Sequence, residues 1–413
     1  MHTPSHLQIP SERSNTAALF RSLRHRNYRL FFIGQGISLI GTWMQQIAVT
    51  WLVYRLTGSA MLLGVVGFAT SIPMFLLSSF AGVLADRFDK RRMLLATQSV
   101  AMLQAAVLAI LTLAHAISVV HIIPLAALLG LSNAFDMPTR QAFLVQMIEE
   151  KADLGNAIAL NSSMVNGARL IGPSIAGILI ATLGEGPCFL LNAMSYLAVL
   201  ASLLAMRLPP FERAQRMESV LRGWKEGVRY VAASPRIAAI LLLLALVSMM
   251  GMPYTVLLPV FARDILGGGP HTLGFLAGST GVGALAGALL LASRKGTAGL
   301  ERWIAGAGMI FAAGLCGFSF SRALPLSMLM LGFTGFGMMV GLASSNTILQ
   351  TLTDDDKRGR VMSLYATAFL GMTPFGALLA GSMGSRFGAP HTVLASSIAV
   401  ALGALLFARR RGR

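Results

Sequence analysis

Charged residues are scarce in this chain. Asp, Glu, Lys and Arg make up 12% of its 413 residues, about half the share in a typical soluble domain. Hydrophobic residues make up 55%, and the mean hydropathy is +0.69. This balance excludes a soluble globular domain and a disordered chain. Lys and Arg outnumber Asp and Glu by 33 to 16, but they are too dilute among apolar residues for a nucleic-acid-binding protein, so we expect no nucleic-acid partner.

Cysteine is nearly absent as well. Cys188 and Cys316 lie far apart in apolar runs, so the sequence predicts neither a disulfide framework nor a metal site. A nucleotide-binding Gly-x-x-x-x-Gly-Lys-Ser/Thr loop is missing, which excludes a primary pump. An intramembrane enzyme would need His-x-x-x-His, Gly-x-Ser-x-Gly or paired acids at mid-membrane, and none occurs. We therefore expect no enzyme activity, no catalytic residues, no metal and no cofactor.

Long apolar runs are what the sequence has in abundance. A span needs roughly 20 mostly apolar residues, and we predict twelve: 30–54, 62–85, 93–115, 117–138, 157–183, 188–206, 237–261, 272–293, 303–321, 324–348, 360–384 and 389–408. All connections are short except 207–236. The prediction is an all-α membrane protein with two six-helix bundles, 1–206 and 237–413. In the connecting linker, 207–236, apolar and basic side chains alternate as on an amphipathic helix that lies on the inner leaflet.

The basic residues support this count of spans. With both termini inside, only Arg55, Arg263, Arg322 and Arg386 fall outside, and Arg169 falls within a span. All other Lys and Arg fall on the inner side, as the positive-inside rule requires. We expect an integral protein of a bacterial inner membrane with both termini in the cytoplasm. The net charge of +17 is then a signal of orientation.

The two predicted halves share a repeated segment. A shift of 204 residues superposes 155–177 on 359–381, and all four glycines of each segment coincide. Each half has an even number of spans, so the two copies insert in the same orientation. A parallel repeat about an axis along the membrane normal is a plan found in secondary transporters. A channel is less well matched, because two similar halves are suited to rocking.

The loop after the second predicted span carries a known pattern. Residues 82–92 read Gly-Val-Leu-Ala-Asp-Arg-Phe-Asp-Lys-Arg-Arg and resemble the signature loop of the major facilitator superfamily. The resemblance implies the major facilitator fold, with a loop that closes the cytoplasmic side and releases as the cavity turns inward. Gly82, Asp86, Arg87 and Arg91 would act in this gate, and Asp86 would face the positive end of the helix that opens at Arg360. Asp89 departs from the family, which usually has glycine there.

A second pattern lies in the fifth predicted span. Gly172 and Pro173 begin the run Gly-Pro-Ser-Ile-Ala-Gly, which resembles the Gly-Pro-x-x-Gly-Gly signature of proton-coupled antiporters in the superfamily. Alanine replaces the first of the final glycines. Small residues allow helices to approach closely in lipid, and proline bends the helix. Close packing without antiport would produce the same pattern.

Three further segments resemble one branch of the superfamily. They are Asn133–Gln141, Asn161–Pro173 and Arg358–Ser363, and they are similar to the twelve-span branch that holds the enterobactin exporter and the macrolide efflux pumps. The resemblance implies export of an amphipathic small molecule, siderophore-like or drug-like, driven by protons. Uptake or lipid flipping by the same fold is the alternative. We expect a monomer whose partners are its small-molecule substrate, protons and membrane lipid.

Polar side chains form stripes on three predicted spans at 100° per residue. Polar groups are costly against lipid, so these stripes should face the interior of the bundle or its water-filled cavity. The cavity candidates are Gln35, Thr42 and Gln46 in the first span, Asn133 in the fourth and Asn166 in the fifth, with Tyr254, Asn346 and Tyr365 as weaker candidates from the second half.

Asp136, Arg140 and Arg169 are the candidates for proton coupling. A charge near mid-membrane costs about 2.5–3.5 kcal/mol on insertion scales, so it tends to be paired or functional. Asp136 is the only acid on a predicted cavity stripe, and we interpret it as the protonatable group. Arg169, or Arg140 four residues away, would hold it ionised until the cavity faces the acidic side. The alternative is a salt bridge at the inner rim that only closes the inward gate.

Overall fold

The computed structural model describes residues 20–208, 220–294, 296, 299–354 and 357–410. Short helical turns at Arg21–Arg24 (η1) and Lys151–Asp153 (η2) flank the helices of the N-terminal half. These helices are α2 (Arg26–Thr57), α3 (Ala60–Arg87), α4 (Lys90–Leu113), α5 (Val119–Gln146), α6 (Leu154–Leu183) and α7 (Glu185–Ala205).

The C-terminal half begins with a short helix from the linker, α8 (Val220–Ala233). Its first long helix is interrupted by two π-helical turns, η3 (Val247–Gly251) and η4 (Phe261–Ile265), where Gly251, Pro253 and Pro259 disturb the regular hydrogen bonding. The helices of this half are α9 (Pro235–Leu246), α10 (Tyr254–Val260), α11 (Pro270–Ala292), α12 (Leu300–Phe320), α13 (Leu324–Leu352), α14 (Arg358–Leu370), α15 (Thr373–Phe387) and α16 (Ala389–Arg410).

Eleven helical stretches of the described chain are long and apolar enough to cross a membrane, and each coincides with a predicted span. The remaining prediction, 30–54, falls on α2. Its 32 residues extend about 48 Å, but Gln35, Gln45 and Gln46 lower its hydropathy, and it is not among the eleven. The polar residues that mark α2 as a candidate cavity helix therefore also weaken its signal as a span.

Short turns join the helices at defined capping residues. After α2, Gly58 adopts the left-handed conformation with φ of 60°, and the Ser59 hydroxyl accepts a hydrogen bond from the Leu62 amide at the start of α3. After α3, the Asp89 carboxylate accepts hydrogen bonds from the Arg91 and Arg92 amides, at 2.8 and 3.2 Å. Asp89, the departure from the superfamily loop, is thus the N-cap of α4.

One predicted span ends too early. The fourth span is predicted to end at residue 138, a proline, but α5 continues to Gln146. Beyond the proline, Phe143 and Leu144 are buried against Tyr28 of α2, and this packing stabilises the added turns. Neighbouring helices can compensate for the hydrogen bond that proline removes.

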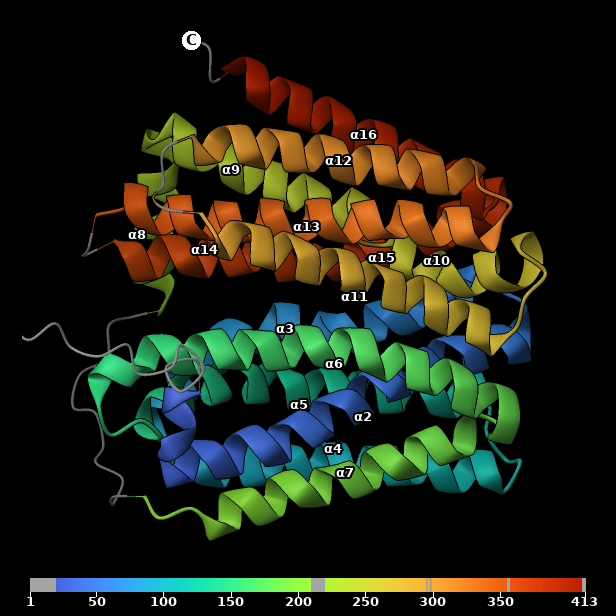
Figure 1. Ribbon diagram of the computed structural model, residues 1–413, viewed down its shortest axis with the longest axis horizontal. Coiled ribbons are helices and arrows are strands. Elements are labelled where there is room, and N and C mark those ends of the chain that lie inside the picture. Colours follow the sequence, from blue (N-terminus) through green and yellow to red (C-terminus); the bar gives the residue numbers. More distant parts are fainter. Residues whose placement is uncertain (1–19, 209–219, 295, 297–298, 355–356, 411–413) are drawn as a thin grey trace, which may run out of the picture.

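The two repeated segments, which are 204 residues apart, also begin and end at equivalent positions in the structure. α6 begins at Leu154 and ends at Leu183, and its counterpart begins at Arg358 in α14 and ends at Phe387 in α15. The counterpart is broken near Gly371, where Pro374 stands at the position of Leu170 and removes one backbone donor. Both copies run in the same direction along the molecule (Figure 1).

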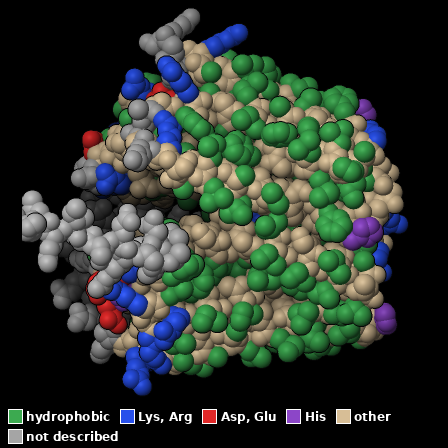
Figure 2. Space-filling model, in the orientation of Figure 1, with side chains coloured by type: hydrophobic (Ala, Val, Ile, Leu, Met, Phe, Trp, Pro, Cys, Tyr) green, Lys and Arg blue, Asp and Glu red, His purple; other side chains and the backbone are tan. Residues whose placement is uncertain are grey.

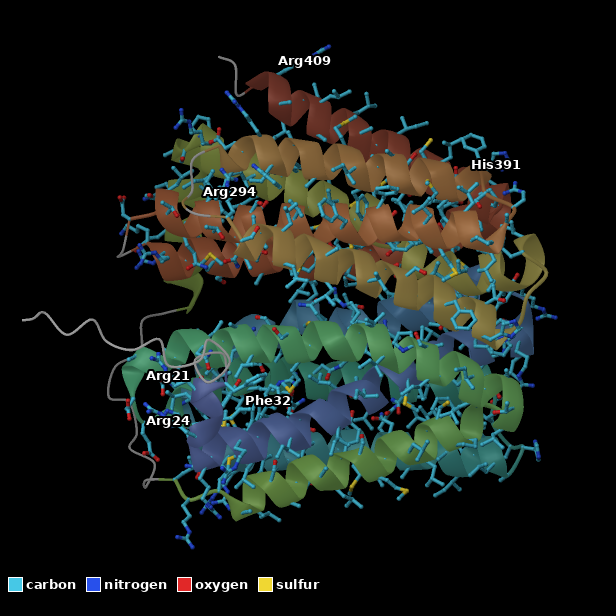
Figure 3. The ribbon with its side chains drawn as sticks, viewed as in Figure 1. Arg21, Arg24, Phe32, Arg294, His391 and Arg409 are labelled. Atoms are coloured by element: carbon cyan, nitrogen blue, oxygen red, sulfur yellow. The ribbon has the colours of Figure 1, made fainter. Side chains whose placement is uncertain are left out.

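The long helices form two groups that lie side by side (Figure 1). One group contains α2–α7 and the other α9–α16. Figure 2 shows Lys and Arg concentrated at one end of the molecule and His at the other. Arg21, Arg24 and Arg294 mark the first end and His391 marks the second (Figure 3). We call them the basic end and the far end.

A buried carboxylate fixes the start of α2 at the basic end. Asp153 is only 1% exposed and forms ion pairs with Arg21, Arg24 and His25. Burial alone raises the pKa of Asp153, but the hydrogen bond from His25 and the charges of Arg21 and Arg24 outweigh it and hold that pKa below its ordinary value of 3.8. The ionised carboxylate therefore stabilises the fold.

Stability should consequently depend on pH through Asp153. Since its pKa is lower in the folded state, its contribution is complete above about pH 4 and is lost as the pH falls through the folded pKa. We expect the protein in detergent to have a higher Tm than Asp153→Asn at pH 7, and this difference to shrink towards pH 3. Glu150→Gln, at an exposed partner of Arg24, is the control with a small effect. A difference independent of pH would contradict the assignment.

Candidate functional site

The far end is closed by contact between α6 and α11. At Gly274 of α11, a Cβ atom would lie 2.5 Å from the carbonyl oxygen of Pro173 and 2.9 Å from the Cα of Gly177. Only glycine allows the two backbones to approach so closely. Gly172 has a different neighbour, because its Cα faces Trp43 of α2. The Gly-Pro run therefore packs α6 between α2 on one side and α11 on the other.

A second pair of helices, α3 and α15, closes the far end beside the first. A Cβ atom at Gly64 would lie 2.7 Å from the carbonyl oxygen of Ala377 and 2.9 Å from the Cα of Gly381. Further along, the rings of Phe75 and Phe375 pack edge to face with centroids 5.3 Å apart. The two halves thus meet along two pairs of helices.

Polar groups add a third contact between the halves at the far end. The Tyr54 hydroxyl of α2 donates a hydrogen bond to the Asp264 carboxylate of η4. The Arg263 guanidinium lies over the Tyr54 ring, 5.8 Å from its centroid. This contact would have to break if the far end were to open.

The basic end is open between the two halves. Figure 2 shows the surface hollowed there. On α6, Ile158 and Ser162 are exposed near this end, whereas Gly177 is buried against α11. On α2, Gln46 is exposed and lies about 140° around the helix from the exposed Ile33. The cavity is therefore reached from the basic end.

Asp136 is buried within the N-terminal half, and its side chain is turned towards α4. It accepts hydrogen bonds from Gln98 Nε2 at 2.7 Å and Thr97 Oγ1 at 3.2 Å, and forms an ion pair with Arg140 Nη2 at 2.9 Å. The carboxylate is 3% exposed and Arg140 about a quarter exposed. In this conformation the Asp136 carboxylate lies in the interior of the N-terminal bundle against α4, and not at the surface of the open cavity. Its role in proton coupling stays a prediction.

Three amides form a second buried network in the same half. Gln45 of α2 donates to Gln104 of α4 at 2.9 Å and accepts from Asn192 of α7 at 2.8 Å. Gln98, Gln104 and Asn192 were not among the predicted site residues. The signal that could have found them is the presence of uncharged amides in otherwise apolar spans.

Arg169 lies apart from Asp136. Its guanidinium carbon is 5.0 Å from the centroid of the Trp43 ring. Its Nε is buried and has no hydrogen-bond partner among the described residues. Arg140, and not Arg169, is therefore the partner of Asp136.

The other predicted cavity residues divide by exposure. Gln46 is exposed, Thr42 and Asn133 are half-buried, and Gln35 and Asn166 are buried. In the second half, the buried Tyr254 hydroxyl donates to Thr280 at 3.4 Å, Tyr365 donates to the Leu342 carbonyl at 3.2 Å, and the half-buried Asn346 accepts from Gln350 at 2.5 Å. Tyr254 and Tyr365 thus bond within their own half.

Only part of the predicted gate at the basic end lies among the residues whose side chains the structure describes. The side chains of Gly82 and Asp86 lie outside the described residues, and Arg87 is exposed. Arg91 donates to the Leu204 carbonyl of α7 at 2.7 Å. Arg360 forms an ion pair with Glu226 of α8 at 2.7 Å. Arg360 therefore links α14 to the linker helix.

A comparison with known protein families identifies the chain. The model of the family described as transmembrane secretion effector (MFS_3) matches residues 17–412. The chain belongs to this family. As a transmembrane secretion effector it is a membrane transporter and not an enzyme. Among the described residues, no group of His, Cys, Asp or Glu could hold a metal ion.

Similar proteins of the transmembrane secretion effector type transport siderophores and drugs. The staphyloferrin A transporter of Staphylococcus aureus is 29% identical over 367 residues, which cover 88% of this chain and 91% of the relative. The multidrug efflux pump Tap of Mycolicibacterium fortuitum is 26% identical over 378 residues, which cover 89% and 90%. The resemblance predicted from the sequence motifs is thus confirmed.

A solved structure supports the fold of this secretion effector. A bacterial homologue of the human lysosomal transporter Spinster, in an inward-facing and unoccupied conformation, superposes with a TM-score of 0.74. The match covers 93% of this chain and 96% of that structure at 14% identity. The identity is low, so the likeness concerns the fold.

Proposed function

We propose that this protein is a proton-coupled exporter of an amphipathic small molecule, siderophore-like or drug-like. In this proposal α2 also spans the membrane, which brings the number of spans to twelve. The helices α2–α7 and α9–α16 then form two bundles of six spans each, 1–206 and 237–413, joined by the linker 207–236. The protein acts as a monomer. The observation that carries the proposal is the contact between the bundles, which is tight at the far end, whereas the described surface is hollowed at the basic end.

The basic end is the cytoplasmic end in this proposal. Lys and Arg favour the cytoplasmic side of a membrane. The start of α2 and the end of α16 both lie at the basic end (Figure 1). Both termini are then cytoplasmic in a bacterial inner membrane, and the cavity opens to the cytoplasm. An exporter loads its substrate in this state.

Alternating access would exchange one set of contacts for another. Opening the far end requires α6 to separate from α11, α3 from α15, and Tyr54 from Asp264. Closing the basic end would bring the loop of Asp86 to the start of α14. Arg360 would then have two carboxylates within reach, Glu226 of the linker helix and Asp86.

Asp136 would bind the coupling proton. It is an acid buried in mid-bundle, held by Gln98 and Arg140. Protonation removes its charge and weakens its attraction for Arg140, which is part-exposed and free to turn towards the cavity. Protonation of Asp136 and release of Arg140 would in this way couple proton binding to a rearrangement of α4 and α5.

Proton movement in vesicles tests this function. The purified protein is reconstituted in proteoliposomes with a pH-sensitive dye inside, and staphyloferrin A or a macrolide is added as a probe. We expect at least one probe to move protons in the direction opposite to its own movement. Probe transport without proton movement would contradict antiport. Accumulation together with protons would indicate uptake, and transfer of a fluorescent phospholipid between leaflets would indicate a flippase.

A further inference from the structure

Arg169 is a cation in the middle of α6 that forms no ion pair with a carboxylate among the described residues. It stands halfway along the 30 residues of Leu154–Leu183, which is the depth of the membrane centre in the proposed topology. Among the described residues, its guanidinium carbon lies over the Trp43 ring, 5.0 Å from the ring centroid. Its Nε is buried without a hydrogen-bond partner in the described chain. An unpaired charge at this depth is costly and is typical of a functional site.

The side chain of Arg169 points towards the interior and away from lipid. The lipid face of α6 carries the exposed Ile171, Ile175 and Ile178, and Arg169 lies about 160° around the helix from Ile171. Ser162 lies within about 20° of Arg169 and is exposed near the basic end. The face of α6 that bears Arg169 is therefore the face that lines the cavity.

Arg169 also lies where the two halves come together. A Cβ atom at Gly281 of α11 would be 2.9 Å from the Cα of Leu170, the next residue. The contacts of Gly278 and Gly274 with α6 follow in the direction of the far end. Arg169 thus stands near the closed end of the cavity, where α6 meets α11 of the other half.

We propose that Arg169 is an oxyanion-binding residue and that the substrate carries a carboxylate or a similar oxyanion. A guanidinium that lies over an indole ring satisfies its charge in part without using its N–H groups, and these can bind a carboxylate in bidentate fashion. The repeat-related position in the second half is Thr373, a neutral residue that bonds within its own half. The charge is therefore available on one wall of the cavity. This inference rests on the proposed function, the export of an amphipathic small molecule, and adds the chemical class of that molecule.

Binding of matched probes to the full-length protein tests the assignment. The protein is placed in phosphatidylcholine nanodiscs and titrated calorimetrically with 2-naphthoate and with its neutral amide, 2-naphthamide. We expect Arg169→Gln to weaken naphthoate binding by about tenfold or more, since charge-assisted hydrogen bonds are lost, and to leave amide binding unchanged. Arg169→Lys should retain part of the preference for the anion, because the charge remains but the bidentate geometry is lost.

Arg386→Gln is the matched control. Arg386 is exposed in the last turn of α15 at the far end, so its removal changes the net charge equally without reaching the cavity. Unchanged amide binding shows that a variant is folded. An equal preference for naphthoate in Arg169→Gln and in the unmodified protein would overturn the proposal. The assay requires neither transport nor protons, so failure of proton-coupled export would be recognised separately.

A lipid headgroup could supply the same oxyanion chemistry. Phosphatidylglycerol nanodiscs distinguish this source from a soluble substrate. Naphthoate binding that is equal in both lipids assigns the site to a soluble anion. Binding that is suppressed in phosphatidylglycerol, and is insensitive to that lipid in Arg169→Gln, assigns it to a headgroup phosphate.

Discussion

Replacing Asp136 by Asn is expected to reduce proton-coupled efflux to the level of empty vesicles. An asparagine side chain still accepts the hydrogen bond from Gln98 and fills nearly the same volume, so α4 and α5 should remain packed. The site can no longer bind and release a proton, and Arg140 loses its ionic partner. Substrate exchange down its own gradient should persist, because it requires no proton. Efflux in everted vesicles and counterflow in proteoliposomes measure the two activities.

The matched control is Glu149→Gln, which removes an exposed carboxylate between α5 and η2. Its efflux should equal that of the unmodified protein. Efflux by Asp136→Asn that keeps its pH dependence at normal expression would show that the Asp136–Arg140 pair closes a gate and does not carry a proton. Loss of both efflux and exchange would also contradict the coupling role, because a coupling residue is not needed for exchange.

Adding one methyl group at Gly274 or Gly64 is expected to open the far end. The new Cβ atom would meet backbone atoms of the opposite half at 2.5–2.9 Å, and backbone cannot move aside as a side chain can. Overpacking of this kind costs about 1–3 kcal/mol, which corresponds to about a 5- to 150-fold shift in the balance of two conformations. We expect Gly274→Ala and Gly64→Ala to increase the population that is open at the far end.

Labelling from the far side measures this shift. A cysteine replaces Gln46, which is exposed on the cavity face of α2, and Cys188 and Cys316 are changed to serine. An impermeant maleimide added outside should label this position faster in both glycine variants. Gly167→Ala is the control on α6, because a Cβ atom there meets nothing within 4 Å. Equal labelling in all variants would mean that the far end opens elsewhere.

The sequence predicted most of the fold because a membrane imposes simple rules. A span must be long and apolar, and basic residues accumulate on one side, so eleven spans could be located within a few residues. The misplaced boundary at Pro138 has a tertiary cause, since Phe143 and Leu144 extend α5 by packing on Tyr28. Packing partners of this kind leave no trace in a local apolar pattern.

The candidate site was predicted less completely. Helical spacing correctly grouped Asp136 with Arg140, because residues four apart lie on one face of a helix. It could not show that Gln98 turns the carboxylate towards α4, nor that Arg169 stacks on Trp43 of another helix. Both facts depend on how the helices are rotated against each other, and the spacing of residues within one helix gives no information about that rotation.

The sequence by itself determined that this protein is a membrane transporter of the major facilitator type, the positions of eleven of its spans, and the residues that carry charge into the bilayer. The transporter type follows from the resemblance of its motifs to the family, and the spans and their charges follow from the cost of placing polar groups in hydrocarbon, which acts on each segment separately. Only the tertiary structure decided that the halves meet at the far end, that Arg140 neutralises Asp136, and that Arg169 has no carboxylate partner among the described residues. These properties arise from the approach of distant segments, where single glycines such as Gly274 determine how closely two helices pack.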